Sequence, residues 1–301
     1  MVMTEEKPLD LRLREVLAPN ASPMTGPGTT TFILGDGKVC LIDPGPEEES
    51  HLQAILGALG PHEKIEAILI THPHVDHSAL APRLSQISGA PTYGYGKAGA
   101  QRSALMTALI AQGFTGGGEG ADTHFIPDIL LSDGAQIDLS CGRIEALHTP
   151  GHMAEHLSFA FGQTLFCGDL IMAWAPSLVS PPDGDMSDYY KSLDKIAGRD
   201  FSILRPTHGA AIDNPRERIT EVIAHRRQRE TQILDILASG TYDLASLVAK
   251  IYADVSPALW PAASRNALAH LIDLIERDLV FAEPWPDPKA RFTLKMLKTS
   301  L

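Results

Sequence analysis

The chain of 301 residues is long enough for one large domain or two, and its hydrophobic content of 44% is ordinary for a globular protein with a sizeable core. Its net charge of -12 argues against tight binding to the phosphate backbone of nucleic acids. The charged segment 1–15 lacks the apolar core of a signal peptide, and no later segment is apolar for long enough to span a membrane, so we expect a cytoplasmic protein without a membrane partner.

The first half of the chain alternates short β-rich runs with segments of helical periodicity, which indicates a layered α/β fold. A Gly-Asp-Gly turn at 35–37 joins two of the runs into a predicted hairpin that ends at Asp43. The predicted strands are 29–34, 39–42 and 65–70, and the predicted helices are 47–59, 78–87 and 103–112.

The second half begins with further strands and ends with helices. Strands are predicted at 135–139, 143–148, 157–161, 164–167 and 202–205, with one helix at 188–197. After Pro215 a long charged helix is followed by helices at 244–252 and 264–278 and by short β pieces at 279–282 and 291–294. Helices followed by a terminal hairpin are typical of a winged helix. We therefore predict two domains, a catalytic domain at 1–214 and a winged-helix domain at 215–301.

The segment Thr71–His77, with the sequence THPHVDH, follows directly on an apolar strand. His72 and His74 alternate along an extended segment and can point the same way, while Asp76 and His77 can face a second ion as the chain turns into a helix. Neutral imidazoles and carboxylates are the ligands of zinc and similar ions. Four such side chains within six residues predict a metal site.

Later strand ends supply further candidate ligands. His148, His152, Asp169 and His208 each follow an apolar run at a turn. Because the ends of successive strands converge on one edge of an α/β sandwich, these distant residues can share a site with the histidine cluster.

The chain resembles the metallo-β-lactamase fold hydrolases. Their motif His-x-His-x-Asp-His is similar to residues 72–77, and their later ligands resemble His152 after Thr-Pro-Gly, Asp169 in Cys-Gly-Asp and His208 in Thr-His-Gly. The resemblance implies a four-layer αβ/βα sandwich with supporting Asp43 and two zinc ions, although iron or manganese fits the same ligands. The implied ligands are His72, His74 and His152 on one ion and Asp76, His77 and His208 on the other, with Asp169 between them.

Residues 18–29, residues 151–156 and the tail from His225 resemble the lactamase-β-like branch with a C-terminal winged helix. The resemblance implies a dinuclear hydrolase in which a bridging hydroxide attacks a small acyl substrate: a thioester, an ester or a lactone. Asp76 and Asp169 are then the catalytic residues, orienting the nucleophile and holding the ion pair. Two alternatives stay open: a zinc-dependent endoribonuclease acting on single-stranded RNA, and a metal-domain ligand sensor with a DNA-binding winged helix.

Several other side chains are weighed against these roles. We favour His152 over His148 because the Thr-Pro-Gly turn carries His152 beyond its strand. His156 packs in the structure, contacts substrate or orders His152. Tyr189 or Tyr190 stabilises an oxyanion, or one of them packs and the other lies on the surface. The run at 226–229 is interpreted as a solvated helix face rather than a phosphate site. The sequence leaves the oligomeric state open.

Overall fold

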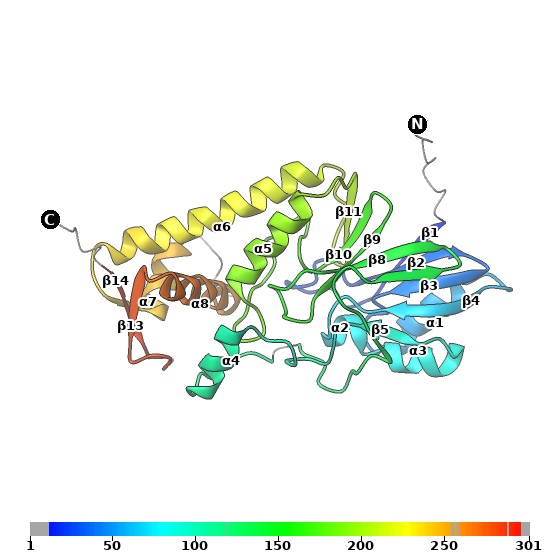
Figure 1. Cartoon of the computed structure of the whole chain (residues 1–301), viewed down its shortest axis with the longest axis horizontal. Helices are drawn as coiled ribbons and strands as arrows, with labels where there is room; N and C mark the ends of the chain where they lie inside the picture. Colours follow the sequence, from blue (N-terminus) through cyan, green and yellow to red (C-terminus); the bar gives the residue numbers. More distant parts are fainter. Residues whose placement is uncertain (1–11, 119, 254–255, 257–258, 288, 296–301) are drawn as a thin grey trace.

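Two β-sheets packed face to face form the core of the larger, N-terminal part of the computed structural model, which describes residues 12–118, 120–253, 256, 259–287 and 289–295 (Figure 1). Residues 1–11 of the N-terminal segment considered above lie outside this part of the chain. The first sheet follows chain order: β1 (Leu13–Leu17), β2 (Thr30–Asp36), β3 (Lys38–Ile42), β4 (Lys64–Leu69), β5 (Thr92–Gly94) and β6 (Ile129–Leu130). The second has the order β11 (Ile203–Pro206), β10 (Thr164–Gly168), β9 (Leu157–Phe161), β8 (Gly142–His148) and β7 (Gln136–Leu139).

Aromatic and aliphatic side chains fill the space between the two sheets. Successive residues of a strand point to opposite faces, so Phe32 and Leu34 of β2 face the second sheet while Ile33 packs on the outer side. The rings of Phe32 and Phe166 meet edge to face, with centroids 5.0 Å apart. Phe166 comes from β10, so this contact joins the two sheets directly.

Helices cover both outer faces of the sheet pair. Leu52 of α1 (Glu49–Gly57) and Leu84 of α3 (Ala81–Ser88) pack on the first sheet. Leu193 of α5 (Met186–Ala197) and Ile219 of α6 (Pro215–Leu237) pack on the second. The order helix, sheet, sheet, helix confirms the predicted αβ/βα sandwich. Two short helices, α2 (Val75–Ser78) and α4 (Ala104–Ala111), lie in the connections after β4 and β5.

The last part of the chain forms a small helical unit with a β-hairpin, as predicted for a winged helix. It contains β12 (Tyr242–Asp243), α7 (Leu244–Ile251), α8 (Trp260–Glu276), β13 (Val280–Glu283) and β14 (Arg291–Leu294). Its core includes Leu247, Leu271 and Phe292 together with Ile233 and Leu237 from the end of α6. Helix α6 thus runs from the second sheet to the C-terminal end of the molecule (Figure 1).

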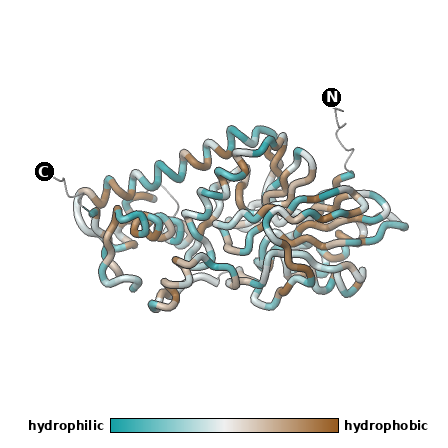
Figure 2. The backbone as a smooth tube through the Cα atoms, viewed as in Figure 1, coloured by the Kyte–Doolittle hydropathy of each residue, from teal (hydrophilic) through white to brown (hydrophobic). Residues whose placement is uncertain are grey.

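The hydropathy of the backbone follows this layering. Hydrophobic segments concentrate in the strands, whereas α6 alternates between hydrophilic and hydrophobic turns along its length (Figure 2). Within the described residues, no helix is both long and apolar enough to cross a membrane.

Two predicted helices differ from those observed. The single helix predicted at 78–87 is split, because α2 ends at Ser78 and α3 starts afresh at Ala81 with Pro82 in its first turn. The helix predicted at 264–278 instead starts at Trp260, where Pro261 occupies the first turn, and ends at Glu276. In both cases proline marks the beginning of a helix.

The contact between the sheets gives a stability prediction. Replacing the buried ring in Phe166→Ala should lower the free energy of unfolding by about 3 to 5 kcal/mol, because a cavity remains between the sheets. The matched control Phe281→Ala removes a ring that is 49% exposed and should change it by less than about 1 kcal/mol. Urea unfolding followed by circular dichroism measures both, and equal losses would contradict this account of the core.

Candidate metal centre

Seven polar side chains meet at one edge of the sandwich, where strands of both sheets end. The first sheet contributes the segment after β4 and helix α2, and the second contributes the turns after β8, β10 and β11. These are the seven residues predicted from the sequence: His72, His74, Asp76, His77, His152, Asp169 and His208. Their possible ligand atoms form three overlapping groups, and within each group all atoms lie within 4.8 Å of one another.

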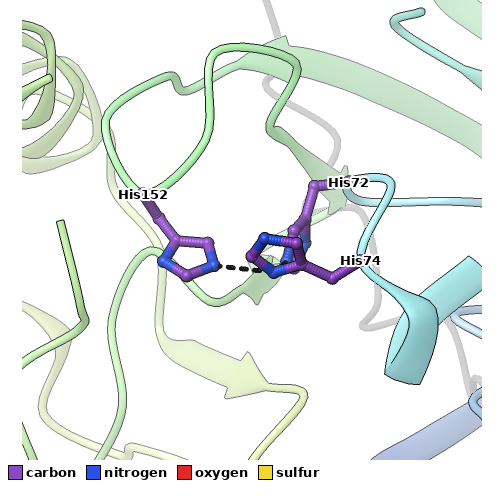
Figure 3. A group of neighbouring side chains, drawn as sticks. All are labelled: His72, His74 and His152. Atoms are coloured by element: carbon purple, nitrogen blue, oxygen red, sulfur yellow. Dashed lines mark hydrogen bonds between the residues drawn. The ribbon is translucent and has the colours of Figure 1, made fainter. Parts of the chain in front are cut away.

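The first group consists of three imidazoles whose nitrogens converge (Figure 3). His74 Nδ1 lies 2.9 Å from His72 Nε2 and 3.2 Å from His152 Nε2. His72 and His74 project from the segment after β4, and His152 approaches from the opposite loop (Figure 3). Three nitrogens in this arrangement match the donor set of a tetrahedral ion with one open position.

The second part of the cluster alternates imidazoles with carboxylates. His208 Nε2 lies 3.3 Å from Asp76 Oδ2 and 3.4 Å from Asp169 Oδ2. His77 Nε2 lies 3.6 Å from both Asp76 Oδ2 and Asp169 Oδ1. Asp169 also lies 3.7 Å from His152 Nε2, so its carboxylate stands between this part and the three imidazoles.

Hydrogen bonds outside the cluster orient the imidazoles. The Nδ1–H groups of His77, His152 and His208 donate to Asp43 Oδ2, to the Leu178 carbonyl and to the Gly28 carbonyl, at 2.9, 2.6 and 3.1 Å. The Nε2 atom of each ring then faces the cluster. Burial opposes protonation of His208, but Asp169 raises its pKa to about 10, so a metal bound there displaces the proton on Nε2. All three rings are therefore oriented to bind a cation through Nε2.

Asp43 is the buried support beneath the cluster. Its carboxylate accepts hydrogen bonds from the Thr71 backbone N–H at 2.8 Å, the Thr71 hydroxyl at 2.7 Å and the Thr207 hydroxyl at 3.0 Å, besides the one from His77. The backbone of Asp43 has a φ of 50°, in the left-handed region that aspartate and asparagine tolerate. Asp43 thus ties the end of β4 to the end of β11.

The electrostatics of the cluster suit a cation. Burial lowers the pKa of His72 well below its usual range and that of His74 to about 3, so both rings remain neutral donors. Burial opposes ionisation of Asp169, but His208 and His77 outweigh it and hold its pKa well below the usual range. His77 Nε2 and Asp169 Oδ1 are buried without a hydrogen-bond partner. An ion bound to these two atoms would satisfy them, so the donor set fits a divalent metal.

The structure places the rival histidines outside the cluster. His148 stacks on Tyr95, with ring centroids 3.8 Å apart, and its Nε2–H donates to the Ala154 carbonyl. His156 is fully buried, and its Nε2 accepts the backbone N–H of Asp169 at 3.1 Å. It therefore supports the segment that carries Asp169 rather than facing a substrate.

Neither tyrosine faces the cluster. Tyr189 is completely buried and its hydroxyl donates to the Leu170 carbonyl, while Tyr190 packs in the same core beneath the guanidinium of Arg227. The prediction that a tyrosine stabilises an oxyanion is therefore wrong, because both side chains pack between α5 and α6.

A cavity of about 500 Å³ opens in front of the cluster. Its lining includes His74, Asp76 and His208 of the cluster together with residues of α6 and α8. The contribution of α6 and α8 to the cavity was not predicted, because their residues lie far along the chain in helices that were assigned to another domain. Side-chain spacing along α6 alone does not say which face meets the cavity.

The loop that contains Ser177, Leu178 and Val179 is held in place by both C-terminal helices. Asn266 Oδ1 of α8 accepts the Val179 N–H at 3.0 Å, and Arg226 of α6 donates to the Ser177 carbonyl. Between these two anchored residues, the Leu178 carbonyl accepts the proton of His152. The C-terminal helices therefore contact the loop that orients a histidine of the cluster.

Comparison with known proteins identifies the family. The model of the metallo-beta-lactamase superfamily matches residues 24–208, which contain the whole cluster. The chain belongs to the metallo-β-lactamase superfamily. It is a hydrolase of this superfamily, whose members typically bind divalent metals, and residues 244–285 match the beta-lactamase associated winged helix domain. The predicted boundary near Asn214, where α6 begins, stays a prediction.

Relatives and solved structures agree with this membership. A beta-lactamase-like protein 2 homolog of Drosophila melanogaster is 30% identical over 271 residues, covering 86% of each chain. An atrochrysone carboxyl ACP thioesterase of Aspergillus fumigatus is 27% identical over 233 residues, covering 75% of this chain and 65% of the relative. A beta-lactamase domain protein from Burkholderia ambifaria shares the fold with a TM-score of 0.76 at 20% identity, covering 94% of this chain and 91% of that one.

The supporting carboxylate gives a testable prediction. Asp43→Asn keeps the size and the backbone conformation but removes the charge and turns an N–H₂ group toward donors, so metal affinity should fall about 10- to 100-fold. Competition with a chelator measures the affinity. The control Asp36→Asn alters an exposed residue of the β2–β3 hairpin and should leave it unchanged. Unchanged affinity in Asp43→Asn would show that the cluster does not depend on this support.

Proposed function

We propose that the protein is a dinuclear metal-dependent hydrolase of small acyl compounds, with thioesters as its leading substrate class. The observation that carries this proposal is the apolar lining of the cavity beside the cluster. Met24, Trp174 and Leu259 line it although they are 46%, 47% and 40% exposed. Large apolar side chains left open to solvent beside reactive groups are typical of a binding site for an apolar ligand.

The relatives support the same substrate class. One relative covering most of this chain is named as a thioesterase acting on a carrier-protein substrate. The volume of about 500 Å³ is in the usual range for a small-molecule pocket. The negative charge of the chain disfavours binding of a polyanion such as RNA. The endoribonuclease and the DNA-binding sensor are therefore weaker hypotheses.

For the ligands, we propose His72, His74 and His152 on one ion and Asp76, His77 and His208 on the other, with Asp169 between them. The three overlapping groups of donor atoms support this division. Zinc is the proposed metal, although imidazole and carboxylate also suit iron and manganese. When bound, such an ion pair supplies Lewis acidity and a water of lowered pKa.

The protein's own groups then orient the reactants. The side chain of Asp76 is 23% exposed, against 7% for Asp169, and accepts the Thr29 hydroxyl at 3.3 Å. We assign Asp76 to orient the attacking water from the cavity side and Asp169 to hold the two halves of the cluster together. The apolar lining would keep the acyl chain, and not bulk water, next to the bond that breaks.

The ligand assignment predicts a difference between two neighbouring histidines. His152→Ala and Asp76→Ala should each remove metal and abolish hydrolysis, whereas His148→Ala should keep most of both, because His148 bonds only outside the cluster. Elemental analysis of the purified variants measures the metal. Full metal content in His152→Ala would show that the assignment of this ligand is wrong.

The substrate class is tested with the metal-loaded protein and a panel of thioesters, lactones, carboxyl esters and single-stranded RNA. We expect turnover of the acyl compounds and none of the RNA, and we expect chelation to abolish turnover. Cleavage of RNA with the acyl panel untouched would replace this proposal by the endoribonuclease.

A further inference from the structure

Basic side chains from the C-terminal helices form one part of the cavity lining. His225, Arg226 and Arg229 come from α6, and Arg265 comes from α8. Among the described residues that line the cavity, the carboxylates are Asp76 and Asp169, and both belong to the cluster. The lining of the cavity therefore combines the carboxylates of the cluster with basic side chains from α6 and α8.

Arg226 is buried without a negative partner among the described residues. It is 2% exposed, its Nη1 donates to Asn266 Oδ1 at 3.0 Å, and its Nη2 donates to the Ser177 carbonyl. Both acceptors are neutral, and its buried Nε has no hydrogen-bond partner. A buried guanidinium normally needs a counter-charge, because loss of its hydration is costly.

Arg229 is half-buried and likewise has no negative partner among the described residues. Its Nη1 donates to Gln232 Oε1 and to the Ile251 carbonyl, and its guanidinium lies over the ring of Tyr252. In contrast, neighbouring Arg227 pairs with Glu230. Interpreting 226–229 as a solvated face is therefore wrong for the buried Arg226, whereas Arg227 and Gln228 are exposed and Arg229 is half-buried at the cavity.

We propose that the part of the cavity lined by Arg226, Arg229 and Arg265 is a subsite for an anionic group of the substrate, a carboxylate or a phosphate. This group lies away from the bond that is hydrolysed. This inference rests on the proposed acyl hydrolase and specifies its substrate. The guanidinium of Arg229 offers paired donors that match either oxyanion, and Arg226 and Arg265 add positive charge to the same part of the cavity. The apolar part of the lining receives the chain that separates the anion from the acyl carbonyl.

The anion has two possible sources in a thioester: the far end of the acyl chain or the thiol side. Three compounds separate them. Octanoyl-N-acetylcysteamine is neutral, the monothioester of suberic acid with N-acetylcysteamine carries a carboxylate on the acyl chain, and octanoyl-phosphopantetheine carries a phosphate on the thiol side. Each is also made as the thioether, which cannot be hydrolysed. Calorimetry with the metal-loaded protein measures thioether binding, and steady-state kinetics measures KM for the thioesters.

We expect one anionic compound to bind the unmodified protein at least about tenfold more tightly than the neutral compound, as is typical of hydrogen bonds to charged groups. Arg229→Gln should remove this preference and raise KM for that thioester, with KM for the neutral thioester nearly unchanged. Arg229→Lys should retain part of it. The control Arg216→Gln changes an exposed arginine of the same helix outside the cavity and should retain all of it.

The outcomes separate the subsite from the proposed function. Preference for the carboxylate places the subsite at the acyl end, and preference for the phosphate places it on the thiol side. No anion preference, or a preference that survives in both Arg229→Gln and Arg265→Gln, overturns the subsite even if thioesters are hydrolysed. Arg229-dependent binding of an anionic thioether without hydrolysis of any thioester would instead overturn the proposed function and leave the subsite standing.

Discussion

The buried carboxylate of Asp43 is the interaction on which the metal centre depends. It accepts hydrogen bonds from Thr71 after β4, from Thr207 after β11 and from His77 in α2. These donors come from two different sheets and a helix, so a single buried charge fixes their relative positions. A carboxylate at this depth is tolerated only when such donors surround it, and the donors are in turn held by the carboxylate. The seven side chains of the cluster stand on this framework.

Local sequence was sufficient for the layered fold and for one half of the site. The alternation of strands and helices predicted the sandwich. The segment Thr71–His77 holds four of the seven side chains close together in the sequence. The partners His152, Asp169 and His208 were chosen through resemblance, because strand ends also offered His148. Short strands such as β5 and β6 escaped prediction, since pairing with neighbours and not local pattern defines strands of two or three residues. The contribution of α6 and α8 to the cavity escaped it for a related reason: only tertiary packing decides which face of a helix meets a site.

Charge acts on two scales in this molecule. The net charge of -12 sets the field that a distant polyanion encounters, and it is repulsive. Inside the cavity the field is set by the nearest groups, and Arg226 and Arg229 line the same cavity as the cluster. Salt weakens interactions between distant charges more than interactions between neighbouring ones, so the net charge and the arginines of the cavity act over different distances. An acidic protein with a cationic recess can thus repel long nucleic acids and still receive a small anion, which reconciles its composition with the proposed subsite.

The anchored loop at Ser177–Val179 bears on how such a protein can evolve. Arg226 and Asn266 of the C-terminal helices fix the residues on either side of Leu178, whose carbonyl sets the ring orientation of His152. The C-terminal helices are therefore not an independent attachment that could be exchanged by recombination without disturbing the hydrolase. The two parts should be inherited together, and substitutions at the loop and at its helical anchors should be selected as one unit.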